Sequence, residues 1–517
     1  MQNLIIKKFA FPRLICLFLY SLISCITLSV QAQNAWRRAA SHIDYKVESS
    51  VQLSSDITPF WHTANKYGLS GIRDSWGYLE AGISRKIESD SAYNWKIGYG
   101  LSFAAAYNMT SAFSVQELFA DIQWKRVRLS VGSKKRDSEL KNPLLSTGGL
   151  TYGINARPIP QVRFELPEFW TIPKTKGWLA IRGHIAYGCF TDASWNEDFH
   201  APKSLYSAGS LYHSKAGFLR IGNQQKFPLS FTGGLEMNTQ FGGEAWNVGH
   251  RADDNSGFTG AYIDLPENLS SFWHAFIPGG DDGDRDGAYK NVEGNHLGSW
   301  HFSLDYKGKN WGARAYVEHF FEDHSQMFLE YGWKDLLFGI ETNLPKNPII
   351  STLLYEYIST TDQTGGIYHD ATSTIPEQIS GADNYYNHMI YGAWQHWGNT
   401  IGNPLLISPI YNKNGQITVF HNRIKAHHVG IMGSPTVEVS YRLLYTHHKS
   451  LGTYLKPTTD PLYANYFMAE VGYKPKWGRG VSLTASLAGN TGDILGNSLG
   501  GMFTLRWNGN INKQISK

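Results

Sequence analysis

Apolar and polar residues alternate along most of this chain in segments of about ten residues. In residues 299–307, Trp300, Phe302, Leu304 and Tyr306 share one face of an extended strand, and the residues between them are polar or charged. A period of two indicates a β-strand with one apolar and one polar face. The pattern recurs in residues 77–87, 95–105, 116–124, 126–132, 178–189, 216–221, 228–239, 313–321, 327–343, 350–359, 417–431, 436–446, 465–474, 481–487 and 503–507. The sequence therefore predicts an all-β protein.

The number and character of these segments favour a transmembrane antiparallel β-barrel of about 18 strands over a soluble β-sandwich. Their apolar faces often begin or end in Trp or Tyr, as the aromatic girdles of outer-membrane barrels do. Their opposite faces often carry charged residues, which a water-filled or plugged lumen accommodates. Because an open sheet edge cannot be hydrogen-bonded in lipid, such strands must close into a barrel.

The links between the segments are of two kinds. Some are short, such as residues 124–126 and 475–480. Others are long, namely residues 134–160, 191–212, 243–297 and 361–415. Outer-membrane barrels have short periplasmic turns and longer outer loops, so we expect the long links outside the cell. Residues 55–68 do not alternate, and we expect residues 33–73 to form a periplasmic or plug segment of one barrel domain at 33–517.

The first 32 residues have the features of a secretory signal peptide. A positively charged start precedes an uncharged apolar stretch at residues 14–30, and residues 30–32 supply a small-x-small cleavage pattern. We expect cleavage after Ala32 and localisation in the outer membrane. Residues 22–25 also resemble a lipoprotein cleavage box, so lipidation is the alternative. No run of 18 apolar residues follows, which excludes a helical membrane protein.

Composition agrees with an exported barrel. The chain has 52 Gly, 29 Tyr, 26 Phe and 17 Trp, with 17% charged residues, where soluble proteins carry about a quarter. The formal net charge is +4, and the signal removes three positive charges, so the mature chain is nearly neutral and unsuited to nucleic acid. Cys189 alone remains after cleavage, so no internal disulfide can form.

The most specific local motif lies in the long link at residues 243–297. Asp282, Asp284 and Asp286, followed by a glycine and then Glu293, fit the pattern of an EF-hand calcium loop. Alternate carboxylates, a glycine for the sharp turn and a closing bidentate Glu suit Ca²⁺. Proline and glycine precede the motif where an EF-hand has a helix, so an acidic surface loop is the alternative. Ca²⁺ is the one cofactor that the sequence indicates.

Nucleophilic catalysis finds little support. Residues 496–500 match G-x-S-x-G, but a nucleophile elbow needs a helix and then an acid and a His later in the chain, and residues 501–517 contain no Asp, Glu or His. The adjacent histidines at 427–428 and at 447–448 point to opposite faces of their strands, so neither pair suits one metal ion. We therefore predict that the protein is not an enzyme.

A cluster of aromatic and amide residues at 384–403 is the candidate carbohydrate site. Sugars present flat C–H faces and many hydroxyls, which aromatic rings and amide side chains can match. The alternative is that the rings pack at the barrel rim and the amides occupy turns. The candidate polysaccharide-binding residues are Tyr385, Tyr386, Asn387, Trp394, Trp397 and Asn403.

Short fragments, spread from Pro59 to Trp507, carry a resemblance to a known family. They are residues 59–61, 65, 67–68, 148–150, 155–160, 294–300, 319–323, 355–357, 360–365, 385–387, 402–404 and 422–423. In these fragments and their order, the chain resembles the Wzi family of capsule assembly proteins of Gram-negative outer membranes. The resemblance implies an 18-stranded barrel, plugged on the periplasmic side, whose outer loops bind capsular polysaccharide like a lectin without cleaving it.

Pattern and resemblance together predict an outer-membrane protein that binds and anchors capsular or extracellular polysaccharide at the cell surface. Its expected partners are that polymer and the outer-membrane lipids. A carbohydrate-selective porin is the first alternative, and an outer-membrane hydrolase is the second. The sequence leaves open the identity of the polymer, the state of the lumen and the oligomeric state.

Overall fold

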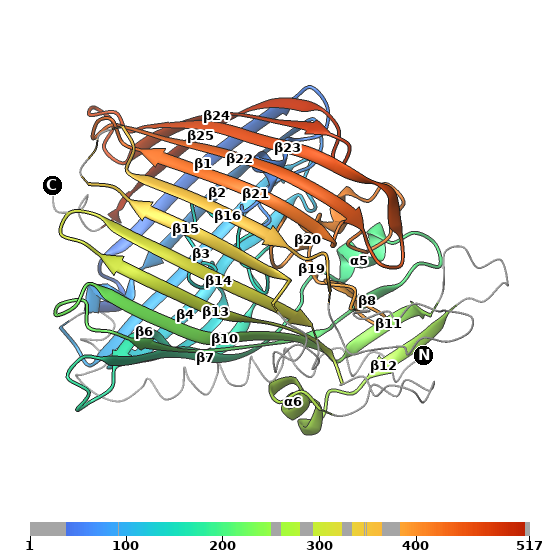
Figure 1. Ribbon diagram of the computed structural model, residues 1–517, viewed down its shortest axis with the longest axis horizontal. Coiled ribbons are helices and arrows are strands. Elements are labelled where there is room, and N and C mark those ends of the chain that lie inside the picture. The colour runs from blue at the N-terminus through green and yellow to red at the C-terminus, as the bar shows by residue number, and fades with distance from the viewer. Residues whose placement is uncertain are drawn as a thin grey trace.

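The protein folds as a closed barrel of 18 antiparallel strands (Figure 1). The structure, a computed structural model, describes residues 38–90, 92–249, 260–279, 293–322, 333–345, 347, 349–363 and 383–511. The barrel strands are β1 (Ile43–Ser54), β2 (Ser75–Arg85), β3 (Trp95–Tyr107), β4 (Phe113–Trp124), β5 (Val127–Ser133), β6 (Gln161–Thr171), β7 (Leu179–Cys189), β9 (Leu211–Ile221), β10 (Leu229–Phe241), β13 (Asn295–Lys307), β14 (Gly312–Glu322), β15 (Leu336–Asn343), β16 (Thr352–Ser359), β21 (Ile424–Gly433), β22 (Val439–Gly452), β23 (Pro457–Tyr473), β24 (Val481–Gly492) and β25 (Ser498–Asn510). Each pairs with the next along the chain, and β25 pairs with β1 to close the barrel, which confirms the predicted fold class.

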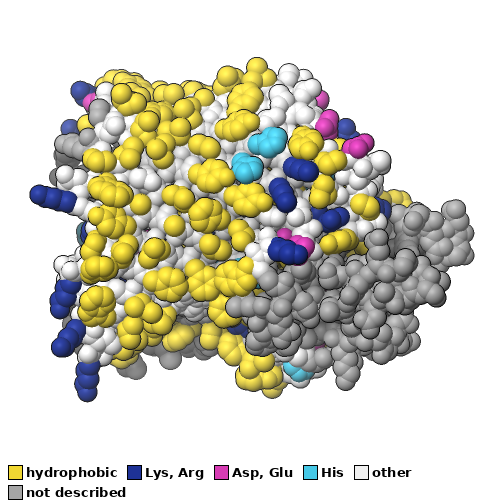
Figure 2. Space-filling view, viewed as in Figure 1, with side chains coloured by type: hydrophobic (Ala, Val, Ile, Leu, Met, Phe, Trp, Pro, Cys, Tyr) yellow, Lys and Arg dark blue, Asp and Glu magenta, His cyan; other side chains and the backbone are white. Residues whose placement is uncertain are grey.

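The two faces of the wall meet different surroundings. In β1, Val47, Val51 and Leu53 point outward and are exposed, whereas Glu48 and Gln52 point inward and are buried. Figure 2 shows hydrophobic side chains spread over the outside of the barrel. Exposing so large an apolar surface to water would cost about 25 cal/mol of free energy per Å², whereas contact with lipid avoids this cost. The outer face is therefore the membrane-facing surface.

Six exposed tryptophans lie at the end of the barrel that has the short turns. They are Trp95, Trp124, Trp178, Trp311, Trp477 and Trp507. Strand β1 begins and β25 ends at this same end. Aromatic girdles mark the membrane interface of such barrels, and their short turns face the periplasm. We call this the periplasmic end and the opposite one, with the long links, the external end.

Two barrel strands were missed by the sequence prediction. Strand β1 lies within residues 33–73, which corrects the expectation of a periplasmic or plug element for residues 43–54. Residues 43–54 do alternate, but the expectation for residues 33–73 was based on residues 55–68, which do not. Strand β6 contains Pro167, which cannot donate to a strand ladder, and the register of β6 against β7 shifts between Leu166 and Trp170.

Three links fold back from the external end and fill the lumen; we call them the plug. They are residues 55–74 with helix α4 (Phe60–Thr63), residues 134–160, and residues 383–423 with η2 (Pro409–Tyr411) and the hairpins β17–β18 (Asn387–His388, Gly392–Ala393) and β19–β20 (Gln395–His396, Asn399–Thr400). Their apolar side chains, including Trp61, Leu150 and Leu405, form one buried cluster with wall residues such as Tyr466. The carbonyl of Leu144 accepts from Arg442, near the periplasmic start of β22, so the plug extends through most of the barrel.

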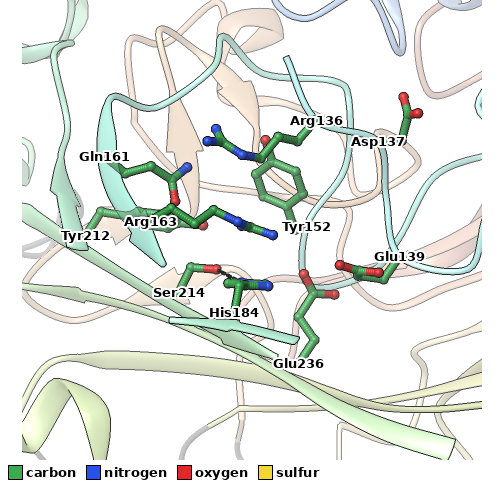
Figure 3. Close-up of a pocket in the computed structure, with 10 residues that line it drawn as sticks. All are labelled: Arg136, Asp137, Glu139, Tyr152, Gln161, Arg163, His184, Tyr212, Ser214 and Glu236. Atoms are coloured by element: carbon green, nitrogen blue, oxygen red, sulfur yellow. Dashed lines mark hydrogen bonds between the residues drawn. The ribbon is translucent and has the colours of Figure 1, made fainter. Parts of the chain in front are cut away.

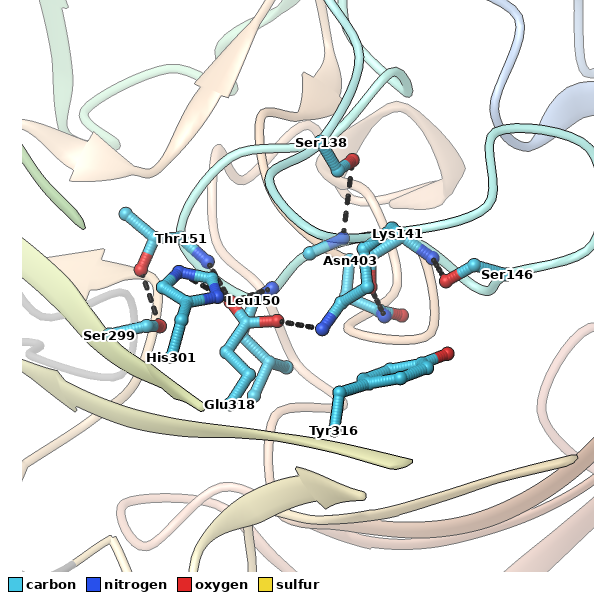
Figure 4. A network of polar contacts seen from close by, with 12 residues as sticks. Ser138, Lys141, Ser146, Leu150, Thr151, Ser299, His301, Tyr316, Glu318 and Asn403 are labelled. Atoms are coloured by element: carbon cyan, nitrogen blue, oxygen red, sulfur yellow. Dashed lines mark hydrogen bonds and ion pairs between the residues drawn. The ribbon is translucent and has the colours of Figure 1, made fainter. Parts of the chain in front are cut away.

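Charged pairs join the plug to the inner wall. Lys141 of the plug pairs with Glu318 of β14 at 2.9 Å, and both side chains are almost completely buried (Figure 4). The same carboxylate accepts from the amide of Leu150 at 2.7 Å. Lys135 of the plug likewise pairs with Glu80 of β2 at 3.2 Å. Charges on the inner face are thus paired, some with the plug and others within the wall, such as Arg314 with Glu341.

The remaining elements gather at the external end (Figure 1). They are α5 (Ala193–Phe199), α6 (Leu269–Phe276) and a small sheet of β8 (Tyr206–Ala208), β11 (Gly243–Val248) and β12 (Ala261–Leu265); η1 (Ile87–Asp90) lies in a periplasmic turn. Among the residues described, no helix combines the length and the apolar character needed to cross a membrane.

Candidate functional site

Four of the six predicted carbohydrate-binding residues lie inside the plug. Tyr385, Tyr386, Trp394 and Asn403 are all 0% exposed. The indole nitrogen of Trp394 donates to the carbonyl of Thr151 at 3.2 Å. The amide of Asn403 donates to the plug backbone and caps its own turn. These four side chains hold the plug together and present no surface to a polymer outside the cell. The rings pack inside the plug, whereas the alternative from the sequence placed them at the barrel rim.

Asn387 is half-buried, and its amide is already engaged. Its Oδ1 accepts from the backbone amide of Val419 at 2.7 Å, and its Nδ2 donates to the carbonyl of the same residue at 3.0 Å. The side chain therefore imitates a backbone pairing between two stretches of the plug. Little hydrogen-bonding capacity remains for a sugar.

Trp397 is the one predicted residue that lines a cleft at the external end. The cleft has a volume of about 350 Å³, within the range of ligand sites. Three plug or loop segments that are distant in the sequence supply its walls. The lining residues are Thr110, Ser111, Ser194, Trp195, Asp198, Phe199 and Trp397. The lining of the cleft thus consists of Trp397, which was predicted as a binding residue, and six residues that were not.

The β19–β20 hairpin places Trp397 at the tip of a tight turn. Trp397 and Gly398 are its two central residues, with φ of +55° and +83°, and positive φ at both positions characterises a type I′ turn. Asn or Gly usually occupies the first position, and a bulky side chain such as that of Trp is disfavoured there by about 1–2 kcal/mol. Unfavourable backbone conformations of this kind persist where surrounding contacts enforce them, often at functional sites.

Contacts from the β7–β9 link hold this turn in place. The carboxylate of Asp192 accepts from the backbone amide of Trp397 at 3.2 Å and from the side-chain amide of Gln395 at 2.8 Å. The indole nitrogen of Trp397 donates to Thr191 Oγ1 at 3.2 Å. A Cβ on Gly398 would come within 2.6 Å of the Trp195 ring, so glycine there allows the two sides of the cleft to pack together.

A buried arginine supports the Trp397 ring from behind. The guanidinium of Arg157 lies 4.2 Å from the ring centroid, in the geometry of a cation–π contact. It also donates to Thr110 Oγ1 at 2.8 Å, which connects the ring to the opposite lip of the cleft. Burial lowers the pKa of Arg157 to about 10, which leaves it charged at neutral pH. The ring is therefore fixed in orientation before any ligand arrives.

Helix α5 forms the other wall of the cleft. The rings of Trp195 and Phe199, one helical turn apart, stack with centroids 4.5 Å apart and planes 18° from parallel. Ser194 and Asp198 lie beside them on the same helix and are exposed. The sequence contains a sign of this wall, because two aromatic residues four positions apart stand beside Ser and Asp in a long link. Only the fold brings that link next to Trp397.

The cleft combines aromatic and polar side chains. Fixed aromatic rings offer flat apolar surfaces, and exposed hydroxyl and carboxylate groups at its edge offer hydrogen-bond partners. The lining residues include no His or Cys, and Asp198 is their one carboxylate, whereas glycoside hydrolysis uses a pair of carboxylates.

A second, polar cavity lies inside the barrel between the plug and the wall (Figure 3). Here His184 Nε2 and Ser214 Oγ are 2.8 Å apart, a pairing that resembles part of a hydrolytic site. The cavity offers about 10 Å³, room for about one water molecule, and Arg136, Arg163 and Glu236 crowd around it. A Ser–His pair enclosed in this way cannot reach a lipid or a polymer.

The calcium hypothesis falls mostly outside the described residues, since Asp282, Asp284 and Asp286 lie in the range 280–292. Glu293, the fourth predicted ligand, is described. Its Oε2 lies 2.5 Å from Nδ1 of His274. Within the described residues, no group of three or more His, Cys, Asp and Glu is arranged to hold a metal ion. Calcium binding by the acidic loop stays a prediction.

Comparisons with known proteins place the fold. No protein-family model matches the chain, and no curated protein matches it in sequence. Among solved structures, Wzi of Escherichia coli, an outer membrane protein involved in group 1 capsule assembly and described as a carbohydrate-binding β-barrel, has a TM-score of 0.53 and 13% identity over 92% of this chain and 86% of its own.

Pseudomonas aeruginosa OprD has a TM-score of 0.43 and 9% identity, over 92% of this chain and 96% of its own. OccK2 from the same organism, solved with glucuronate, has a TM-score of 0.46 and 7% identity, over 92% and 99%. At these identities the likeness to Wzi concerns the fold alone. Together with the apolar outer wall and the tryptophan girdle, it identifies this chain as an outer-membrane β-barrel.

Proposed function

We propose that this barrel binds a polysaccharide at its external end and retains it on the cell surface during capsule assembly, without cleaving it. The observation that carries the proposal is the cleft of Trp195, Phe199 and Trp397, in which Trp397 is held in an unfavourable backbone conformation by three separate contacts. Rigid aromatic platforms bind sugars at low entropic cost. A repeating polymer multiplies modest affinities per unit through avidity.

The packed plug supports this proposal over the porin alternative. Buried apolar residues from all three plug segments contact the wall in one continuous cluster, and the inner charges are paired instead of lining a water-filled channel. A planar-bilayer recording tests the difference. The proposal expects no steady conductance from the wild-type protein, and a stable open current would favour a carbohydrate-selective porin.

Asp198 is the single carboxylate among the lining residues of the cleft, whereas glycoside hydrolysis uses a pair of carboxylates, and this supports binding over hydrolysis. An outer-membrane hydrolase would release lipid or sugar products when the purified protein is incubated with outer-membrane glycolipid or with the polymer. The proposal expects no products. Product release at a steady rate would replace it with the hydrolase alternative.

Substitution of Trp397 tests the site directly. Trp397→Ala removes the ring but keeps the hairpin, and we expect about 2- to 10-fold weaker binding of extracellular polysaccharide purified from the same bacterium, given the energy of a ring contact. The matched control is Tyr262→Ala, an exposed aromatic residue of β12 at the same end. Equal binding by wild type and both variants, with barrels that insert normally, would remove the cleft from the function.

A further inference from the structure

The outward face of four neighbouring strands changes character toward the external end. Near the periplasmic end, exposed apolar residues such as Ile221 and Phe231 form a cross-strand row on this face. Toward the external end, the corresponding row is polar. It consists of Tyr187, His213, Thr239 and His296, which are consecutive partners across β7, β9, β10 and β13.

Lys215 lies on the same outward face, and together with this polar row it forms a polar patch that begins inside the band that lipid is expected to cover. Lys215 points outward, since its partner Ile185 is exposed on the outer face, and it lies six residues along β9 from Ile221. Six residues span about 20 Å of strand, or about 15 Å along the axis of a barrel whose strands tilt by about 40°. Trp178, in the periplasmic girdle, is bonded to the residue after Ile221. A band about 25 Å tall, measured from that girdle, includes Lys215.

Helix α6 lies against the outside of the wall and covers this patch. Tyr187 donates its hydroxyl to the carbonyl of Phe272 at 2.9 Å, and Thr239 donates to the carbonyl of Ala275 at 3.2 Å. Lys215 donates to the carbonyl of Phe276 at the C-terminal end of the helix, where a positive charge is favourable. Beneath the helix, the patch is buried, and His213 and His296 are both 0% exposed.

The opposite face of α6 is apolar, and none of the residues that the structure describes covers it. Leu269, Trp273 and Ile277 recur every four residues, so they form one ridge, and they are 89%, 57% and 48% exposed. In water such a ridge would be unfavourable. It continues the apolar outer wall of β9 and β10, the strands against which the helix packs. The helix thus covers the polar row, together with the apolar wall residues Leu211 and Phe241, and presents an apolar surface in their place.

We propose that α6 is an interfacial helix that lies in the outer leaflet, with Leu269, Trp273 and Ile277 in contact with lipid acyl chains. The helix then completes the membrane-facing band where the wall itself is polar. Its partner is the membrane lipid of the outer leaflet. This inference is independent of polysaccharide binding, because α6 contributes no residue to the cleft around Trp397.

A nitroxide spin label tests the proposal in the full-length protein reconstituted into phosphatidylcholine vesicles. The background replaces Cys16, Cys25 and Cys189 with Ser, and the label is attached at Trp273→Cys. Two reference sites bracket the outcome. Leu304→Cys reports the lipid-facing wall, and Tyr262→Cys reports the exposed β12 strand.

The proposal expects the label at residue 273 to collide with oxygen several-fold more often than with a water-soluble nickel chelate, as the label at residue 304 does. The label at residue 262 is expected to show the reverse. A label at residue 273 that behaves like the one at 262 would place the helix in water and overturn the proposal. Low collision with both reagents would mean that protein covers the ridge, which overturns it as well. If Trp273→Cys fails to insert, Leu269→Cys provides the same readout.

Discussion

The inner and outer faces of the barrel wall are built from the same strands, but they place different requirements on their side chains. On β24, Leu487 faces outward and is half exposed, whereas its neighbours Ser486 and Ala488 face the plug and are buried. The outer face needs only apolar character, because lipid is a uniform solvent. The inner face needs specific partners, because each buried charge must meet an opposite charge or a hydrogen bond.

This difference shows what holds the plug. Lys141, Lys135 and Lys134 each pair with a different wall carboxylate, and the carboxylate of Glu356 accepts from Ser146 and Thr147 of the plug. Buried ion pairs add little net stability, but a mispaired one is strongly unfavourable. The pairs therefore fix the position of the plug, while apolar packing supplies most of the stabilising free energy.

The largest expected effect comes from breaking a buried pair on the inner face. Glu318→Ala leaves the ammonium of Lys141 and the amide of Leu150 without their acceptor, and we expect a loss of about 3–5 kcal/mol in unfolding free energy. Urea denaturation in detergent micelles measures it. Glu168→Ala, at an exposed position of β6, is the control with little expected effect. Equal stability of both variants would mean that the pair does not hold the plug.

A charge on the outer face should have the next largest effect. Leu487→Arg places a guanidinium near the middle of the membrane-facing band, and we expect a loss of about 2–4 kcal/mol in folding into lipid vesicles. Leu487→Phe keeps an apolar side chain and serves as the control. If arginine were tolerated there as well as phenylalanine, this part of the wall would not face lipid.

The stability of the protein should depend on pH through a buried histidine of the plug. Burial, reinforced by the nearby charge of Lys66, lowers the pKa of His62 in α4 to about 3 from its ordinary value of 6.5. Between these values, the unfolded chain binds the proton and the folded chain does not. Stability therefore falls as the pH drops below about 6.5, by at most about 1.4 kcal/mol per pH unit from this group.

His62→Gln isolates that effect. We expect the thermal midpoint of the wild type to fall between pH 7 and pH 4 and that of His62→Gln to fall less. His42→Gln, at an exposed position, should follow the wild type. Identical pH profiles for wild type and His62→Gln would assign the acid sensitivity to other groups.

The same contrast explains what the sequence could predict. Outward residues such as Trp300 and Leu304 alternate visibly, because their role depends on residue type alone, and so the barrel was predictable. Plug residues such as Tyr386 and Asn403 look like binding residues in the sequence, because aromatic rings and amides are equally suited to sugars and to a polar interior. Their burial follows from how the links fold back into the lumen, which alternation does not encode.

The cleft was predictable only in part, for the same reason. Trp397 was a candidate by residue type, but Trp195 and Ser111 come from other links, and only the closed barrel brings the three together. The positive φ of Trp397 is likewise a property of the folded hairpin. The one local sign of this backbone conformation in the sequence was that Trp397 directly precedes a glycine.

The central claim is that the external cleft retains polysaccharide on the cell. The most direct test measures polysaccharide on washed cells and in the medium for a strain that lacks the gene, complemented with wild type or with Trp397→Ala. The account predicts unchanged total polymer, with a shift to the medium in the deletion strain that wild type reverses and Trp397→Ala reverses only in part. An unchanged partition in the deletion strain would contradict it.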